Sequence, residues 1–177
     1  MWIMKYIAAL RSDRRGVAAI EFAIFASLIS IGMLNVTDIA VYVYQRMQVE
    51  YATQAGAQAA WHTCDINHLP ATNNCSGLTT AVTNAVQSTS LGTHVTLQAG
   101  SPSEGYYCVN GSTHALQYVN DVNHKPTDCS SVGSPGLLPG DYITISTTFT
   151  YAPLFPGVTV ASAFGTTITR TALMRLG

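Results

Sequence analysis

Residues 14–22, with the sequence RRGVAAIEF, place one glycine before a long apolar run and one glutamate five residues after that glycine. Hydrolysis of the peptide bond after Gly16 would give Val17 a free α-amino group. The resulting ammonium group would lie four residues before Glu21, which is one helical turn, and could neutralise that carboxylate or the carboxylate of a neighbouring helix. The positive end of the helix dipole favours the same negative charge.

An uncut chain leaves Glu21 without a well-placed partner. A carboxylate within a membrane costs about 2.5–3.5 kcal/mol on insertion scales, and less near the boundary. Arg14 and Arg15 precede it by seven and six residues, so neither is one turn away. A glycine before the cut suits a peptidase that grips extended backbone. The alternative is that Glu21 only marks the start of a helix at the membrane interface, and residue chemistry alone leaves both interpretations open.

The apolar run predicts a membrane-spanning helix. Phe22 to Thr37 gives sixteen residues without a charge, or roughly 24 Å of helix against a hydrocarbon core of about 30 Å. Glu21 and Asp38 would then lie near the two boundaries. The nearby basic residues all precede the run, which predicts a cytoplasmic N-terminus and an exported C-terminal part. A cleaved secretory signal peptide is the competing interpretation, but the run continues into helical sequence as far as Trp61, which favours a retained helix.

The charge distribution argues against a nucleic acid partner. The chain has a net charge of −1, and half of its eight basic residues lie before residue 16, namely Lys5, Arg11, Arg14 and Arg15. Without residues 1–16, four basic residues face eight acidic ones, which gives a net charge of −4. A surface of that kind cannot follow a phosphate backbone.

The sequence predicts an α+β fold, in which a long N-terminal transmembrane helix is followed by a small antiparallel sheet and one short helix. Along the C-terminal half of the long helix, apolar residues recur every four positions, and we expect this stripe to pack on the domain or to contact another subunit. Its members are Val43, Met47, Tyr51, Ala55 and Ala59. A short helix is predicted from Leu78 to before Gly92. Strands are predicted at HVTLQ, YYCVN, DYITISTTFTY and TTITRTALMR, and residues 111–140 are predicted to form a long surface loop.

One strand is predicted in more detail, because DYITISTTFTY alternates along its length. Its apolar face would carry Ile143, Ile145, Phe149 and Tyr151. All four cysteines follow the apolar run, which in an exported domain predicts two disulfides. The simplest of three connectivities is Cys64–Cys75 with Cys108–Cys129.

Both ends of the sequence resemble a known family. RRGVAAIEFAIFASL is similar to the amino-terminal signature of the TadE-like pseudopilins of the tight-adherence (Flp) pilus system. That family has a basic leader cut after glycine by a prepilin peptidase, and a glutamate at the fifth mature position before an aromatic residue. The matching positions are Gly16, Val17, Glu21 and Phe22. GDYITISTTFTYAPLFP resembles the family's strand and PLFP segment, and TTITRTALMR its closing segment, whereas the resemblance does not extend to residues 62–135.

The resemblance implies a minor, pseudopilin-type component, because the major Flp pilins are far shorter and usually carry tyrosine at the position of Phe22. It implies a leader at 1–16 that is removed, a transmembrane and extended helix at 17–61, and an exported domain at 62–177. The implied location is the bacterial inner membrane, crossed once, with the C-terminal domain in the periplasm and a place at the base of the pilus or within it. The implied partners are the prepilin peptidase, other pilins or pseudopilins and the pilus assembly machinery, and the implied role is assembly of a secreted adhesive fibre without catalysis or a cofactor.

Two further features could make contacts. Ala19, Ala23 and Ser27 are spaced four apart and form a small-residue seam that would let membrane helices touch, unless it reflects ordinary alanine usage. The turn at Pro153–Pro156 presents Leu154 and Phe155, which would either pack into the sheet edge or form a contact patch for a partner.

Catalytic and metal chemistry have weak support. His62, Cys64, His68 and Cys75 are residue types that bind zinc, but they lack compact ligand spacing, and export favours a disulfide. The serines in GSPSEG and SSVGSPG lie in turn-like sequence rather than in a nucleophile elbow. The alternative function is therefore a signal-anchored extracytoplasmic adhesin or binding domain that is never cut, with a membrane-anchored hydrolase as the weakest interpretation.

Overall fold

The computed structural model describes residues 15–177, with backbone alone at Arg15 and Ser162. The leader positions Lys5, Arg11 and Arg14 therefore lie outside the described residues. The chain divides into two compact units. One contains the helical residues up to Tyr42 together with Ala152–Phe164, and the other contains Val43–Tyr151 with Gly165–Gly177.

The first unit is the N-terminal part of one long helix and a short segment that returns to it. The helix, α2, runs without a break from Arg15 to Thr63. The returning segment ends in a short 3₁₀ helix, η4, at Val160–Phe164. Side chains at Asn35, Asp38 and Tyr42 hold this segment against the helix. These three positions lie on one helical face, because they are separated by three and four residues.

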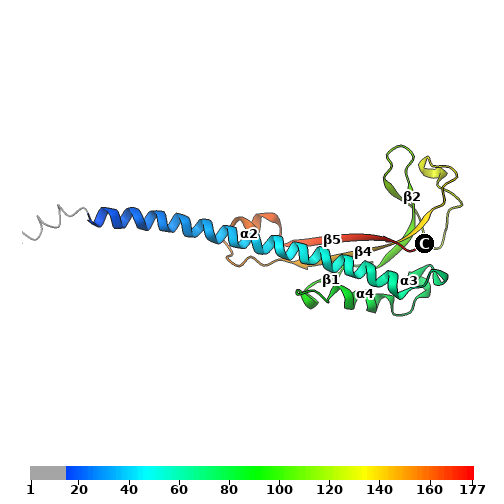
Figure 1. Ribbon diagram of the computed structural model, residues 1–177, viewed down its shortest axis with the longest axis horizontal. Helices are drawn as coiled ribbons and strands as arrows, with labels where there is room; N and C mark the ends of the chain where they lie inside the picture. Colours follow the sequence, from blue (N-terminus) through cyan, green and yellow to red (C-terminus); the bar gives the residue numbers. More distant parts are fainter. Residues whose placement is uncertain (1–14) are drawn as a thin grey trace, which may run out of the picture. The chain divides into compact units, whose positions relative to one another are not determined.

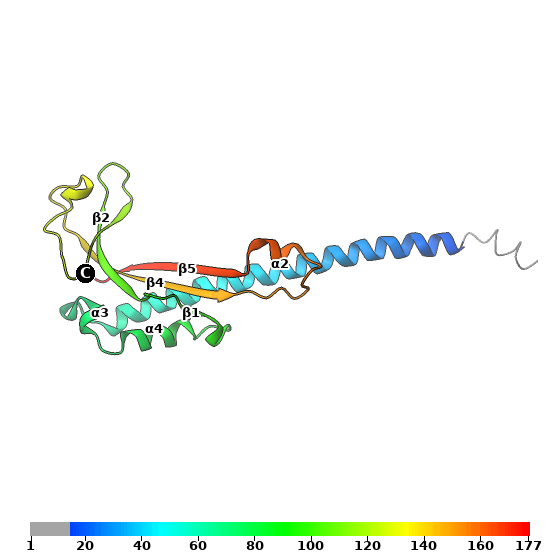
Figure 2. The ribbon, with the colours of Figure 1, turned by 180° about the vertical axis from the view of Figure 1, so that it is seen from behind.

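The second unit is an antiparallel sheet with helices beside it (Figures 1 and 2). The strands are β1 (Thr96–Leu97), β2 (Ser103–Val109), β3 (Leu116–Asp121), β4 (Gly140–Thr150) and β5 (Thr167–Arg175). β4 is central: β5 pairs along one of its edges, whereas β2 and β1 share the other, and β3 extends the sheet beyond β2. The helices are α3 (Ala71–Asn74) and α4 (Leu78–Val86), with 3₁₀ turns at Ile66–His68, Gly92–His94 and Ser130–Val132.

The alternation of β4 sets the core, as its sequence predicts. Ile143, Ile145, Phe149 and Tyr151 are all buried, and Thr147 joins them on the same face. Gly56 of α2 lies where this face meets α4. A Cβ at Gly56 would come within 2.7 Å of a Val86 methyl group and 3.3 Å of an Ile145 methyl group. The absence of a side chain at this position therefore lets α2, α4 and β4 approach closely.

The expectation that the stripe on the C-terminal half of α2 packs on the domain is wrong for its three large residues, whereas Ala55 and Ala59 are half-buried. Val43, Met47 and Tyr51 are 46%, 48% and 61% exposed. The buried face instead carries smaller residues, which are Val49, Ala52, Thr53, Gly56, Ala57 and Ala60. Spacing by four identifies a ridge on a helix but not the direction it faces. The ridge of small residues packs on the sheet because only small side chains permit this close approach.

The disulfide connectivity and the fold class are confirmed. Cys64 is bonded to Cys75 and Cys108 to Cys129. The molecule has the expected long apolar helix and antiparallel sheet, and α4 occupies the predicted short helix. The region predicted as one long loop contains a strand, β3, which forms a hairpin with β2. Its sequence, LQYVND, is mostly polar, and it is an edge strand, so the usual apolar alternation is absent.

Candidate functional site

The N-terminal half of α2 exposes apolar side chains along its length. The helix is long and apolar enough to cross a membrane, with a mean hydropathy of 2.2 in an 18-residue window that has no residue buried inside the protein. Phe22, Phe25 and Met33 are 74%, 66% and 69% exposed. Such a surface in water would be strongly unfavourable, and a lipid environment removes that cost. The structure thus has one helix suited to single-pass membrane anchoring.

Polar side chains within this stretch are satisfied by the helix itself. Ser27, Ser30 and Thr37 donate their hydroxyl protons to the carbonyl oxygens of Ile24, Ala26 and Met33, at 2.7, 2.7 and 2.9 Å. Hydrocarbon offers no hydrogen-bond partners, so such internal bonds are what a spanning helix needs. The seam of Ala19, Ala23 and Ser27 is exposed along its whole length.

The residues of the expected cleavage site lie at the start of α2. Gly16 and Val17 follow Arg15, the first residue of the helix, and both are exposed. A Cβ at Gly16 would meet no other atom within 4 Å, so the glycine is not needed for packing. A peptidase that grips extended backbone would have to unwind this first turn.

Glu21 lies on the exposed apolar surface next to Phe22. Among the side chains described from residue 16 onward, none forms an ion pair with it. The structure therefore places one carboxylate on the part of the helix that is otherwise suited to lipid. A new ammonium group at Val17 would lie one turn away.

Asp38 has a role that the sequence analysis missed. Its place in the sequence predicts only a charge near the membrane boundary, but its side chain is fully buried. It accepts a hydrogen bond from the backbone N–H of Leu154 at 2.8 Å and another from the hydroxyl of Thr159. Asn35 accepts one from the backbone N–H of Val160 at 2.9 Å. No local signal reveals these bonds, because the partners lie more than a hundred residues away in sequence.

The turn at Leu154 and Phe155 belongs to the segment that Asp38 holds. The carbonyl oxygen of Phe155 accepts hydrogen bonds from the backbone N–H groups of Val158 and Thr159, at 3.2 and 3.3 Å, which closes the turn. The side chain of Leu154 remains 52% exposed, although its backbone is bonded to Asp38.

The second unit has a hollow of about 340 Å³ that contains its one strongly perturbed acid among the described residues. Asp141 lies in its wall, is 5% exposed, and has an oxygen, Oδ1, with no hydrogen-bond partner among the described residues. Burial, and secondly the carboxylate of Glu104, raises the pKa of Asp141 to about 7. Glu104 itself accepts hydrogen bonds from the backbone N–H groups of Ala71 and Thr72, at 2.8 and 2.7 Å.

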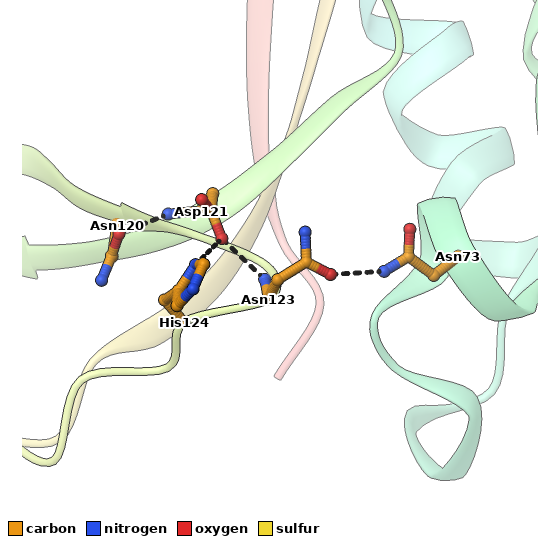
Figure 3. A network of polar contacts seen from close by, with 5 residues as sticks. All are labelled: Asn73, Asn120, Asp121, Asn123 and His124. Atoms are coloured by element: carbon orange, nitrogen blue, oxygen red, sulfur yellow. Dashed lines mark hydrogen bonds and ion pairs between the residues drawn. The ribbon is translucent and has the colours of Figure 1, made fainter.

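A network of polar side chains connects the turn after β3 to α3 (Figure 3). The carboxylate of Asp121 contacts the ring of His124 at 2.9 Å and accepts the N–H of Asn123 at 2.8 Å. The His124 contact holds the pKa of Asp121 below its usual value. Asn123 in turn accepts a bond from Asn73 of α3. The turn places the Lys125 ammonium 5.7 Å from the centre of the Tyr106 ring, at the wall of the hollow.

Two of the four candidate zinc ligands, His62, Cys64, His68 and Cys75, are joined in a disulfide. Cys64 and Cys75 form a disulfide, so neither offers a thiolate. Within residues 15–177, no group of three or more histidine, cysteine, aspartate or glutamate side chains is arranged to hold a metal ion.

Comparison with known proteins adds no relative to these observations. No protein-family model, no curated protein and no solved structure matches the chain at a level that shows a relationship.

Proposed function

We propose that the chain is a minor, pseudopilin-type subunit that is cut after Gly16 and takes part in assembling a tight-adherence pilus or related secretion fibre. The observation that carries the proposal is the position of Glu21. It is a lone carboxylate on an exposed apolar helix surface, five residues after a glycine that packing does not require. The sequence resemblance to the TadE-like pseudopilins supports the proposal, and so does the length and apolar character of α2, which suit a membrane-spanning helix.

Cleavage would allow Glu21, whose charge is unfavourable in lipid, to take part in a contact between subunits. The ammonium group of Val17 carries a charge opposite to that of Glu21 and lies within one turn of it. It also lies at the end of the chain, so it can reach the glutamate of an adjacent subunit. In a low-dielectric membrane, pairing two such charges lowers the cost of each. A subunit would therefore be drawn to a neighbour at a fixed height along the helix.

The uninterrupted helix supports the same role. α2 has no kink-forming proline among its 49 residues, so one helix includes both the apolar half and the residues that pack on the sheet. The exposed ridge of Val43, Met47 and Tyr51 extends the contact surface beyond the expected span. We assign this ridge to subunit contact, because the domain packs against a different face of the helix.

A matched pair of glycine variants tests the proposal. Gly16→Leu should leave the precursor uncut, because the side chain would block the peptidase. Gly32→Leu is the control, since Gly32 also lies in α2 with open space around it. Intact mass of the membrane-purified chains gives the readout in a host that has the peptidase. Normal processing of the Gly16 variant, or loss of processing in both variants, would contradict the proposal.

A binding domain on an uncut signal anchor is the second candidate. The observation in its favour is an aromatic cluster on the sheet, where the ring of Tyr107 contacts those of Tyr118 and Tyr142 at 5.5 and 5.4 Å. Tyr118 is 53% exposed. The other two rings are half-buried, so the cluster offers one exposed tyrosine on an aromatic base, and such amphipathic rings are common at recognition surfaces. The intact mass of the native chain separates the two candidates, because only the first requires removal of residues 1–16.

A further inference from the structure

The segment Ala152–Phe164 has the surface of a membrane-inserted loop. It contains no side chain that is charged at neutral pH, and the nearest charged ones along the chain are Asp141 and Arg170. Four of its large apolar side chains are more than half exposed: Leu154, Val158, Val160 and Phe164 are 52–55% exposed, whereas Phe155 is half-buried. Loops that face water normally expose polar side chains, and an apolar patch of this kind marks a contact surface.

Three donors of the segment form hydrogen bonds to side chains of the helix. Leu154 and Thr159 donate to Asp38, and the N–H of Val160 donates to Asn35. The ring of Phe164 stacks on that of Tyr42, with centroids 5.6 Å apart. Backbone at membrane depth is tolerated only where protein groups satisfy it. Asn35 and Asp38 supply such acceptors, and the side chains of Leu154, Val158 and Val160 remain exposed.

The position of Asp38 changes the length of the apolar zone. Because its carboxylate is buried, the first exposed charge after Glu21 is that of Arg46. The interval between these two residues is roughly 37 Å of helix, whereas the uncharged run before Asp38 gives only about 24 Å. A hydrocarbon core of about 30 Å therefore reaches past Asp38, to the depth at which the segment is attached.

We propose that residues 152–164 insert into the membrane interface at the C-terminal end of the span, with Asp38 holding the segment's polar groups within lipid. The partner is the lipid surface itself. Continuity with the apolar helix identifies it, since the segment is bonded to the face of α2 at Asn35, Asp38 and Tyr42. The inference depends on α2 spanning a membrane and holds whether or not the chain is cut after Gly16.

Tryptophan quenching by brominated lipid tests the insertion. The full chain carries Trp2→Phe and Trp61→Phe, and a single tryptophan replaces Val158. It is reconstituted in phosphatidylcholine nanodiscs, with lipids brominated on the upper acyl chain and one protein per disc. Val36→Trp is the inserted control, because Val36 is 69% exposed within the apolar helix, and Leu138→Trp is the water control, because Leu138 is 80% exposed in the second unit. Quenching at 158 should be at least half that at 36 and clearly above that at 138.

Quenching at 158 no greater than at 138 would overturn the proposal. The proposal would also be overturned if the tryptophan at position 158 is shielded from water only in discs that hold several chains, without quenching by lipid. A second copy of the chain would then be the partner of this surface. A second probe, Leu154→Trp, guards against a local effect of substitution and should be quenched as well.

Two variants of Asp38 test its part. Asp38→Ala removes both acceptor oxygens and should reduce quenching at 158 to the level at 138. Asp38→Asn keeps one acceptor and should retain more of the quenching. Equal quenching at 158 in Asp38→Ala and the parent would show that Asp38 does not hold the segment in lipid, and would overturn that part of the inference.

Discussion

The hydroxyl groups of Thr53 and Thr147 lie 2.6 Å apart, and both side chains are fully buried between α2 and β4. Thr53 also donates to the carbonyl oxygen of Val49 at 2.7 Å. Because a hydroxyl has one proton, Thr147 must be the donor in the bond between the two threonines. This single polar bond joins the long helix to the central strand within an otherwise apolar core.

The direction of that bond predicts unequal effects of substitution. Thr53→Val leaves the Thr147 donor unsatisfied and should lower the free energy of unfolding by about 1–3 kcal/mol. Thr147→Val should cost less, because Thr53 keeps its bond to Val49. The double variant should be close to the milder single one. Urea unfolding of the detergent-solubilised chain, followed by circular dichroism, measures all three. Equal losses for both single variants would show that the donor is assigned wrongly.

The two disulfides should differ in resistance to reduction. Cys108 and Cys129 are each 1% exposed, whereas Cys75 is partly exposed. Thiolate attack requires access to a sulfur atom, so Cys64–Cys75 should be reduced first. Pulsed alkylation during mild reduction, read by mass spectrometry, gives the order. Each bridge closes a short loop and should contribute about 3 kcal/mol in the chain-entropy model. Earlier alkylation of Cys108 and Cys129 would contradict the burial seen here.

Asp141 should make the second unit less stable as pH rises. Its pKa of about 7 in the folded chain exceeds the usual value of 3.8, so the folded state binds the proton more tightly than the unfolded state. The stabilisation is present below about pH 4 and is lost as pH rises toward 7. Asp141→Asn should remove this dependence and raise the free energy of unfolding at pH 8 by up to about 4 kcal/mol.

Urea unfolding at pH 4 to 8 checks this prediction. Asp128→Asn is the control, because Asp128 is a carboxyl whose pKa is lowered rather than raised, chiefly by a hydrogen bond with Ser130. That variant should leave the fall in stability between pH 4 and 7 in place. A parent chain whose stability does not change over this range would contradict the assignment to Asp141.

Features that depend on a local sequence pattern could be predicted from the sequence. The alternation of β4 placed Ile143, Ile145, Phe149 and Tyr151 on one face, and all are buried. The lack of charge before Asp38 predicted the helix that is suited to a membrane. The even count and order of cysteines favoured the observed pairing.

Features that depend on distant contacts could not be predicted. Gly56 determines which face of the C-terminal half of α2 packs on the domain. Its sequence position does not reveal this, because the residues that lie against it, Val86 and Ile145, are distant in the sequence. From the sequence, Asp38 is interpreted as a charge at the membrane boundary, because its hydrogen-bond partners, Leu154 and Thr159, are distant in the sequence. Strand β3 depends on pairing with β2 rather than on its own composition.

N-terminal sequencing of the native protein, purified from membranes of a host with its processing machinery, tests the central claim most directly. The account predicts a single amino terminus with the sequence VAAIEF, which begins at Val17 and places the new ammonium group one turn before Glu21. A native chain that retains the initiator methionine at position 1 would contradict the account.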